Sequence, residues 1–219
     1  MEKSGNETLI YVDADGATLE GALVVPQVTP GIVLFAHGSG SSRLSPRNNF
    51  VARRLQQAGL ATLLIDLLTH AEDRDVATRF DIPLLTQRLL ATTRWLQQQP
   101  VTSALPIGYF GASTGAAAAL QAAAQLGDTV AAVVSRGGRP DLAGAVALNA
   151  VRAPTLLIIG GHDDVVIDLN RQAYELLRCS KEMVIVSGAT HLFEEPGTLE
   201  QVADQASRWF VQHLRAGTT

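Results

Sequence analysis

Six short runs of almost continuous apolar residues constrain the fold of this chain more than any other feature. They span residues 31–37, 60–66, 105–111, 130–136, 154–160 and 182–188. Runs this short and this apolar are typical of parallel strands that are covered on both faces. Helical patterns separate them, at residues 46–59, 81–100, 114–127, 168–179 and 197–215, with a shorter one at 141–150. The alternation predicts an α/β sheet with right-handed crossovers between two layers of helices.

Two more apolar patterns precede these runs, at residues 8–13 and 19–25. The turn sequence ADGA joins them, so we expect an antiparallel hairpin at one edge of the sheet. The whole chain, residues 1–219, is then one three-layer domain with a mostly parallel eight-stranded sheet. Ligands of such sheets bind beyond the carboxyl ends of the strands, so functional residues are expected in the loops there.

The composition excludes several classes of protein. The chain has 219 residues, of which 47% are hydrophobic and 17% charged, and this indicates a globular core rather than disorder. The net charge of −4 comes without any basic run, so nothing indicates binding to nucleic acid or to a membrane surface. The single cysteine, Cys179, excludes an intrachain disulfide, and the amino-terminal residues are polar. We expect a soluble cytoplasmic protein; its oligomeric state cannot be predicted.

A G-x-S-x-G sequence follows the third of the six apolar runs, where Gly111 and Gly115 flank Ser113 at two residues' distance. A serine on a very tight strand-to-helix turn has a strained backbone and projects its hydroxyl above the sheet, and larger flanking residues would collide with neighbouring chains. The alternative is a turn bounded by glycines with no chemistry. The strand–turn–helix context favours a nucleophile.

A serine nucleophile needs a base, and His191 lies just beyond the last predicted strand, at the correct end of the sheet. The other histidines are less suitable. His70 precedes the serine in a charged loop, His37 begins the loop after residues 31–37, His162 is expected to be solvated, and His213 falls on the last predicted helix. We therefore predict that His191 is the base; its alternative role is that of a structural loop residue.

Asp163 and Asp164 follow the strand predicted at 154–160 and are the candidate acids. Both lie between Ser113 and His191, which gives the chain order Ser, Asp, His that this architecture requires. One aspartate should accept the imidazole N–H, and the other should be solvated or cap a helix. The chemistry of the two residues does not separate them.

An oxyanion hole requires two N–H donors. We expect one from the backbone of Thr114, the residue after the nucleophile, and the other from Ser39 in the loop AHGSGSS. Gly38 and Gly40 would let the backbone approach a substrate oxygen closely. The alternative for this loop is a simple glycine-rich turn.

Three arginines, Arg43, Arg47 and Arg136, fall in loops at the same end of the sheet. A guanidinium group can bind a carboxylate or a phosphate through two hydrogen bonds. The three residues are therefore candidate binding groups for an anionic substrate. Their alternative role is to form surface salt bridges or to fix loops.

Taken together, these segments make the chain resemble the α/β-hydrolase family, and most closely its compact, lidless members around dienelactone hydrolase. The resemblance covers nearly the whole chain, from GIVLFAHGSGSS through GASTGA and LLIIGGHDDVV to GATHLFEEPG. It implies a triad of Ser113, Asp163 and His191, because the family's G-x-x-D sequence maps to residues 160–163. Neither a metal nor an organic cofactor is implied.

The chain departs from dienelactone hydrolase itself, which is known for a cysteine nucleophile where this chain has Ser113. Cys179 is expected at the end of a helix, remote from the site. The resemblance therefore implies a serine carboxylesterase-like activity rather than the dienelactone substrate. The short segment 137–153 encodes no apolar cap, which favours a small, water-soluble ester, lactone or thioester, cleaved through an acyl-enzyme intermediate.

Three other interpretations compete with this one. The strand and loop GIVLFAHGSGSSR resemble a dinucleotide-binding sequence, with Asp66 as the ribose ligand, but Arg43 stands where the third glycine belongs. The fold could also serve as a non-catalytic binding module, since a fold does not fix a function. A metal site would draw on His162, Asp163, Asp164 and Asp168, but no pair of histidines at ligand spacing accompanies them.

Overall fold

The computed structural model describes residues 6–214 of the chain. Its strands are β1 (Glu7–Ala14), β2 (Ala17–Val24), β3 (Ile32–Ala36), β4 (Ala61–Ile65), β5 (Ile107–Ala112), β6 (Val130–Arg136), β7 (Thr155–Gly160) and β8 (Lys181–Val186). Its α-helices are α1 (Pro46–Gln57), α2 (Val76–Arg79), α3 (Ile82–Gln98), α4 (Thr114–Leu126), α5 (Ala145–Ala150), α6 (Asp164–Leu176) and α7 (Thr198–His213). Three short 3₁₀ turns complete the described secondary structure, at Glu72–Arg74, Gly127–Thr129 and Pro140–Ala143.

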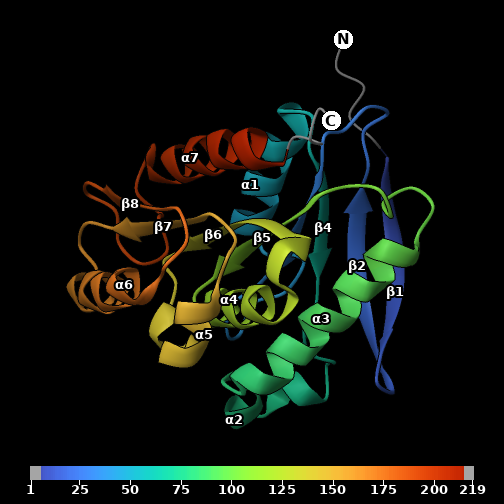
Figure 1. The fold of residues 1–219 in the computed structure, drawn as a ribbon, viewed down its shortest axis with the longest axis horizontal. Coiled ribbons are helices and arrows are strands. Elements are labelled where there is room, and N and C mark those ends of the chain that lie inside the picture. Colours follow the sequence, from blue (N-terminus) through green and yellow to red (C-terminus); the bar gives the residue numbers. More distant parts are fainter. Residues whose placement is uncertain (1–5, 215–219) are drawn as a thin grey trace.

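All eight strands form one sheet in the order β1-β2-β4-β3-β5-β6-β7-β8. β1 and β2 pair antiparallel, and β2 also runs antiparallel to β4. The remaining neighbours, from β4 to β8, are all parallel. The predicted fold class is therefore confirmed, with the amino-terminal hairpin at one edge of a mostly parallel sheet (Figure 1).

Each face of the sheet has its own hydrophobic core. Alternate residues of the central strands point to opposite faces, so that Leu34 and Tyr109 lie in one core and Phe35 and Phe110 in the other. Helices α1 and α7 cover the second core, while α3, α4, α5 and α6 cover the first (Figure 1). Because both faces are covered, β3 to β7 are buried almost throughout, as their apolar sequences predict.

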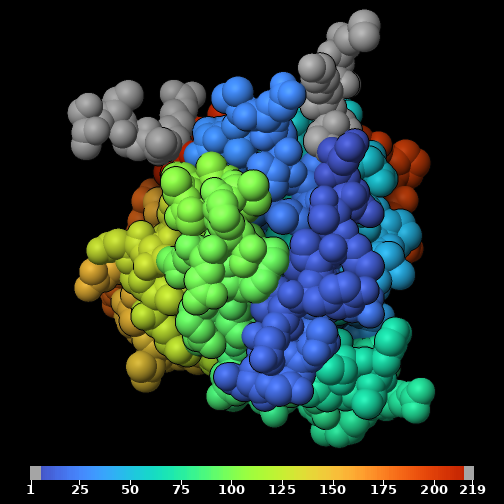
Figure 2. Space-filling view, turned by 90° about the vertical axis from the view of Figure 1, so that its right-hand side faces the viewer, coloured from blue at the N-terminus to red at the C-terminus, as the bar shows by residue number. Residues whose placement is uncertain are grey.

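The amino-terminal hairpin is covered on one face only. Along β1 the last residues alternate between exposed and buried, and Tyr11 remains 55% exposed. Helix α3 lies beside this strand at the surface, as Figure 2 shows. This arrangement explains why the hairpin sequence alternates while the central strands do not.

Two details of the prediction are wrong. β8 was expected to be covered on both faces, but it pairs with β7 alone and most of its residues are partly exposed, including Ile185 at 44%. The helix predicted at 168–179 instead begins at Asp164 and ends at Leu176, so Cys179 lies beyond it. The earlier start matters for the site because it makes Asp163 the residue that precedes the helix.

The connections at the carboxyl ends of the strands are short. Between β6 and β7 the chain forms only the 3₁₀ turn Pro140–Ala143 and the short helix α5, so no lid domain is inserted there. Between β4 and α3 the sequence analysis missed the 3₁₀ turn Glu72–Arg74 and α2. Among residues 6–214, no helix combines the length and the apolar character needed to cross a membrane.

Candidate functional site

Ser113 occupies the turn between β5 and α4 with a backbone conformation that non-glycine residues rarely adopt, at φ +50° and ψ −121°. The loop that follows β6 holds both backbone groups of the serine. Its N–H donates to the carbonyl of Arg136 at 3.3 Å, and its carbonyl accepts the N–H of Arg139 at 3.1 Å. Such strain persists only where neighbouring structure over-determines it. The turn thus has the strained geometry expected for a G-x-S-x-G serine.

The glycines that flank the serine are required by packing. A Cβ at Gly111 would lie 2.5 Å from the Cα of Ala116, and one at Gly115 would overlap the carbonyl oxygen of Ala36. α4 therefore approaches the ends of β3 and β5 closely, and the alanines of its first turns, residues 116–119, are fully buried. The small residues of GASTGAAAA let the helix start directly at the serine.

We expect Gly115→Ala to lower the melting temperature. Alanine normally stabilises a helix relative to glycine by about 1 kcal/mol. Here the added methyl group meets the backbone of Ala36, which cannot turn aside as a side chain could. Overpacking of this kind costs about 1–3 kcal/mol, so the steric term should prevail. Thermal unfolding of the two proteins measures the sign, and a higher melting temperature for the variant would contradict the packing argument.

Asp163 and His191 form a hydrogen-bonded pair at the carboxyl ends of β7 and β8. The distance from His191 Nδ1 to Asp163 Oδ2 is 2.6 Å, and the side chains are 38% and 16% exposed, respectively. Asp163 immediately precedes α6, whereas Asp164 is exposed in the first turn of that helix. Asp163 is therefore the carboxylate that can orient the imidazole.

The histidine also lies close to the loop that holds the serine. A Cβ at Gly137 would be 3.5 Å from Nδ1 and Cε1 of His191 and 3.1 Å from its carbonyl oxygen. Gly137 directly follows Arg136, whose carbonyl accepts the N–H of Ser113. The loop after β6 thus contacts both Ser113 and His191.

Glu195 fixes the segment that carries His191, and the sequence analysis did not single it out. Its carboxylate accepts the N–H of Thr190 at 3.0 Å and the hydroxyl of the same residue at 2.7 Å. These two hydrogen bonds lower the pKa of Glu195. A threonine five residues before a glutamate is no recognised motif, so only the folded loop reveals this contact.

The loop after β3 lies directly over the serine, since a Cβ at Gly38 would be 2.9 Å from Ser113 Cβ. His37 anchors this loop. Its Nδ1 donates to the carbonyl of Gly38 at 2.9 Å, and its Nε2 accepts the N–H of Leu67 at 3.0 Å. Burial lowers the pKa of His37, which agrees with a neutral ring that bridges two loops.

The N–H of Ser39 already has a partner, because it donates to the hydroxyl of Thr114 at 3.0 Å. The N–H of Thr114 itself belongs to the first turn of α4, where backbone donors have no acceptor within the helix. The two predicted oxyanion donors are thus joined through one side chain. An incoming substrate oxygen would have to replace the Thr114 hydroxyl as the acceptor of the Ser39 N–H, or share that N–H with it.

Arg43 is engaged with two carboxylates. Its guanidinium contacts Asp66 at 2.5 Å and Glu20 at 2.6 Å, and its backbone N–H also donates to Asp66. These contacts favour the loop-fixing role for Arg43. They also occupy the carboxylate that a dinucleotide-binding interpretation would assign to a ribose.

Arg136 differs from Arg43 because its guanidinium is buried without a carboxylate partner among residues 6–214. The residue is 6% exposed, its Nη2 donates to Asn48 Oδ1 at 3.1 Å, and its Nε has no hydrogen-bond partner. Phe193 packs against the guanidinium, with 5.9 Å from Cζ to the ring centroid. Burial and the nearby Arg47 lower the pKa of Arg136 to about 10.

Arg47 is the second cation of this group. Its Nη1 contacts Glu194 at 3.1 Å, in a pair with side chains that are 33% and 63% exposed, while its Nε is buried and unpaired. Of the other histidines, His70 and His162 are exposed, and the ring of His213 packs at a tilt against Trp209, with 4.5 Å between the ring centroids. In the described residues, no three His, Cys, Asp or Glu side chains gather in a metal-binding cluster.

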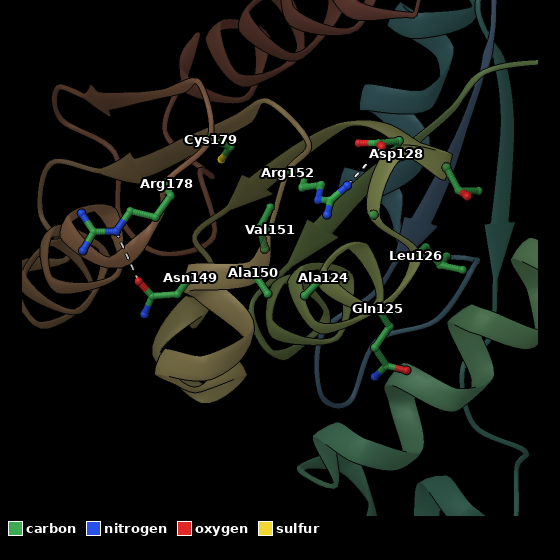
Figure 3. A pocket seen from close by; sticks show the side chains of 12 residues that line it. Ala124, Gln125, Leu126, Asp128, Asn149, Ala150, Val151, Arg152, Arg178 and Cys179 are labelled. Carbon is green, nitrogen blue, oxygen red and sulfur yellow. Dashed lines mark hydrogen bonds and ion pairs between the residues drawn. The ribbon is translucent and has the colours of Figure 1, made fainter.

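A cavity of about 910 Å³ lies elsewhere, near the amino ends of β6, β7 and β8 (Figure 3). It includes Cys179 and two arginines, of which Arg152 contacts Asp128 and Arg178 contacts Asn149. None of the predicted site residues lines it. A second cavity of about 190 Å³ borders the loop after β3 and includes His37, Asp66 and His70.

Comparisons with known proteins give the family and the fold of the chain. The model of the dienelactone hydrolase family matches residues 19–214. A dienelactone hydrolase of known structure from Anabaena variabilis is 58% identical, with a TM-score of 0.93 over 96% of this chain and 99% of that one. Est1E from Butyrivibrio proteoclasticus, at 17% identity, has the same fold, with a TM-score of 0.80 over 94% of this chain and 98% of its own.

Curated proteins from two strains of Mycobacterium tuberculosis are 58% identical over 205 residues, and both carry the name of a phosphoribosyl transferase. The match covers 94% of this chain but 46% of the relatives, so the chain spans about half of their length. The family model and the structure from Anabaena variabilis each extend over most of the chain. On this evidence the chain belongs to the dienelactone hydrolase family of α/β-hydrolases.

Proposed function

We propose that the protein is a serine hydrolase that cleaves small, water-soluble esters, lactones or thioesters through an acyl-enzyme intermediate. The observation that carries the proposal is the 2.6 Å bond between His191 and Asp163, at the same sheet end as a serine with φ +50°. Donation of the Nδ1 proton to the carboxylate leaves Nε2 free to accept a proton. Ser113 in this family position takes the place of the cysteine of dienelactone hydrolase itself.

In the proposed reaction, His191 accepts the proton of Ser113 as the serine oxygen attacks the acyl carbon. Asp163 holds the imidazole in the required tautomer and stabilises its charged form. His191 then protonates the leaving alcohol or thiol, or the ring oxygen of a lactone, and the acyl group remains on Ser113. Water, deprotonated by His191, attacks the ester and releases the acid.

The negative charge that develops on the carbonyl oxygen would be stabilised by the N–H groups of Ser39 and Thr114, each worth about 3 kcal/mol in the barrier. The Ser39 N–H donates to the Thr114 hydroxyl at 3.0 Å. We propose that the substrate oxygen replaces this hydroxyl as acceptor. The hydroxyl therefore keeps the loop in position until substrate arrives.

Labelling with a fluorophosphonate probe tests the proposal. We expect one covalent adduct, on Ser113, found by peptide mass analysis. A panel of p-nitrophenyl esters of graded chain length, run beside small lactones and thioesters, then identifies the preferred substrate. A folded protein that neither reacts with the probe nor hydrolyses any member of the panel would instead be a binding module.

An anionic substrate group is the second part of the proposal. Arg136 is a buried cation without a carboxylate partner in residues 6–214, and Arg47 adds a second positive charge nearby. Leaving such a charge uncompensated is costly, so an anion beside the two guanidiniums would be stabilised. Because Arg136 directly precedes the loop that contacts Ser113 and His191, the anion would belong to the bound substrate.

We expect Arg136→Ala to lower kcat/KM for esters with a carboxylate or phosphate by about 10- to 100-fold, the worth of a hydrogen bond to a charged group. Neutral esters of the same length should lose less than threefold. Arg152→Ala is the matched control, because this arginine lies at the opposite end of the sheet and 70% of its side chain is exposed. An equal loss for both ester classes would assign Arg136 a structural role only.

The name of the Mycobacterium tuberculosis relatives describes proteins about twice as long as this chain. We therefore propose hydrolysis, and not phosphoribosyl transfer, for the part that the two have in common. A phosphate-bearing substrate would nevertheless suit a site beside the guanidiniums of Arg136 and Arg47, whose Nε atoms are buried without a hydrogen-bond partner. Phosphate esters belong in the substrate panel for that reason.

A further inference from the structure

We infer that Asn170 is a positioning residue that couples the nucleophile to the helix carrying the acid. The inference rests on the proposed function, because it concerns the same serine. Asn170 lies on α6, seven residues after Asp163, and is fully buried. Its sequence context, an asparagine in an ordinary amphipathic helix, gives no indication of such a role.

The side chain of Asn170 makes two donations. Its Nδ2 donates to the carbonyl of Gly138 at 3.0 Å and to the carbonyl of Val166, one turn earlier, at 2.8 Å. Its Oδ1 is buried and accepts no hydrogen bond from the described residues. The two N–H groups of the amide are therefore the part that makes contacts, whereas the buried oxygen, which has no partner, costs folding free energy.

Gly138 belongs to the loop 136–139 that holds the backbone of Ser113. The carbonyl of Gly138 is bound by Asn170 of α6, and the next residue, Arg139, donates its N–H to the carbonyl of Ser113. At the other end of the loop, the carbonyl of Arg136 accepts the N–H of Ser113, and Gly137 donates to Ile158 of β7. Asn170 is thus the side chain that ties this loop to the acid-bearing helix.

This link matters because the backbone of Ser113 is strained. A residue at φ +50° relaxes unless its surroundings hold it, and the loop supplies a partner for each of its two backbone groups. Without the amide of Asn170, the carbonyl of Gly138 loses its partner, and the loop holds the serine less firmly. A shift of about 1 Å in a reacting group can cost about 100-fold in rate.

Asn170→Asp tests the inference, since it keeps the shape of the side chain, removes both N–H donors when ionised and places an anionic oxygen against the carbonyl of Gly138. We expect kcat for the best p-nitrophenyl ester, and the rate of Ser113 labelling by the fluorophosphonate, to fall together by about 10- to 100-fold. KM should change less than threefold, because no substrate contact is lost. Asn170→Gln, which keeps an amide donor, should recover part of both rates.

Thr102→Val is the matched control for stability. The hydroxyl of Thr102 is buried and donates to the carbonyl of Leu96 at 2.6 Å, at the amino end of β5. This variant likewise removes a side-chain hydrogen bond to a buried carbonyl, which still accepts the N–H of Gln99 at 3.3 Å. It should lower the melting temperature while kcat stays near that of the wild type. A folded Asn170→Asp protein with wild-type kcat and labelling rate would overturn the inference. A wild-type protein that neither hydrolyses the esters nor reacts with the fluorophosphonate would instead overturn the proposed function.

Discussion

Replacing Ser113 with alanine is expected to lower kcat for ester hydrolysis by about 10⁶-fold and to abolish fluorophosphonate labelling. In the proposed reaction this hydroxyl forms the acyl-enzyme, and the glycines at positions 111 and 115 offer no side chain in its place. The remaining rate should come from the oxyanion donors and from substrate binding alone. Progress curves over several hours, with purified protein at high concentration, measure this residual rate.

Ser103→Ala is a suitable control for the serine variant, because Ser103 is exposed in the turn between α3 and β5, at the opposite end of the sheet. It should retain the wild-type rate. The strained backbone of Ser113 could relax in the alanine variant, so the melting temperature of Ser113→Ala should equal or exceed that of the wild type. Hydrolysis that persists at the wild-type rate after this substitution would exclude Ser113 as nucleophile.

The second large effect is expected for Asp163→Asn, which should lower kcat by about 10⁴-fold near neutral pH. The carboxylate accepts the Nδ1 proton of His191 at 2.6 Å, and an amide can present an N–H there and favour the tautomer with the proton on Nε2. In that tautomer the imidazole cannot accept the serine proton. The substitution keeps the volume of the side chain, so the loss should appear in kcat without unfolding the protein.

Asp164→Asn provides the comparison, because Asp164 is the adjacent residue, is exposed, and lies in the first turn of α6. Its carboxylate stabilises the helix through the helix dipole by less than about 1 kcal/mol. We therefore expect kcat of Asp164→Asn to stay within about twofold of the wild type. Both variants should be measured with the same ester from pH 6 to 9. A larger loss for Asp164→Asn than for Asp163→Asn would reverse the assignment of the acid.

Hydrophobic patterning was sufficient to predict the sheet. β3 to β7 read as continuous apolar runs because helices cover both of their faces, and the hairpin of β1 and β2 alternates because one face is open. The same rule failed for β8, whose sequence is apolar although the strand lies at the edge and stays partly exposed. Composition records the hydrophobicity of a strand but not its place in the sheet.

The sequence could not predict those parts of the candidate site that depend on tertiary contacts. The chemistry of the residues narrowed the candidate acid to two neighbours, and only the family resemblance favoured Asp163. The contact that separates them, from Asp163 to His191, depends on where α6 begins, which the sequence analysis placed at residue 168 instead of 164. Arg43 and Arg136 looked equivalent, yet one meets two carboxylates and the other meets none in residues 6–214. Asn170 binds a backbone carbonyl of the loop after β6, and Glu195 binds a backbone N–H within its own loop. Such contacts leave no periodic signal in a sequence.

The position of β8 at the rim of the sheet has a consequence for the durability of the protein. Strand ends at an open rim fray more readily than those in the middle, and the segment with His191 is connected to this strand. Fraying there would draw the imidazole from its carboxylate while the serine turn, enclosed between β3 and β6, stayed intact. We therefore expect the working lifetime of this molecule at elevated temperature to be set by its last strand, before the central layers come apart.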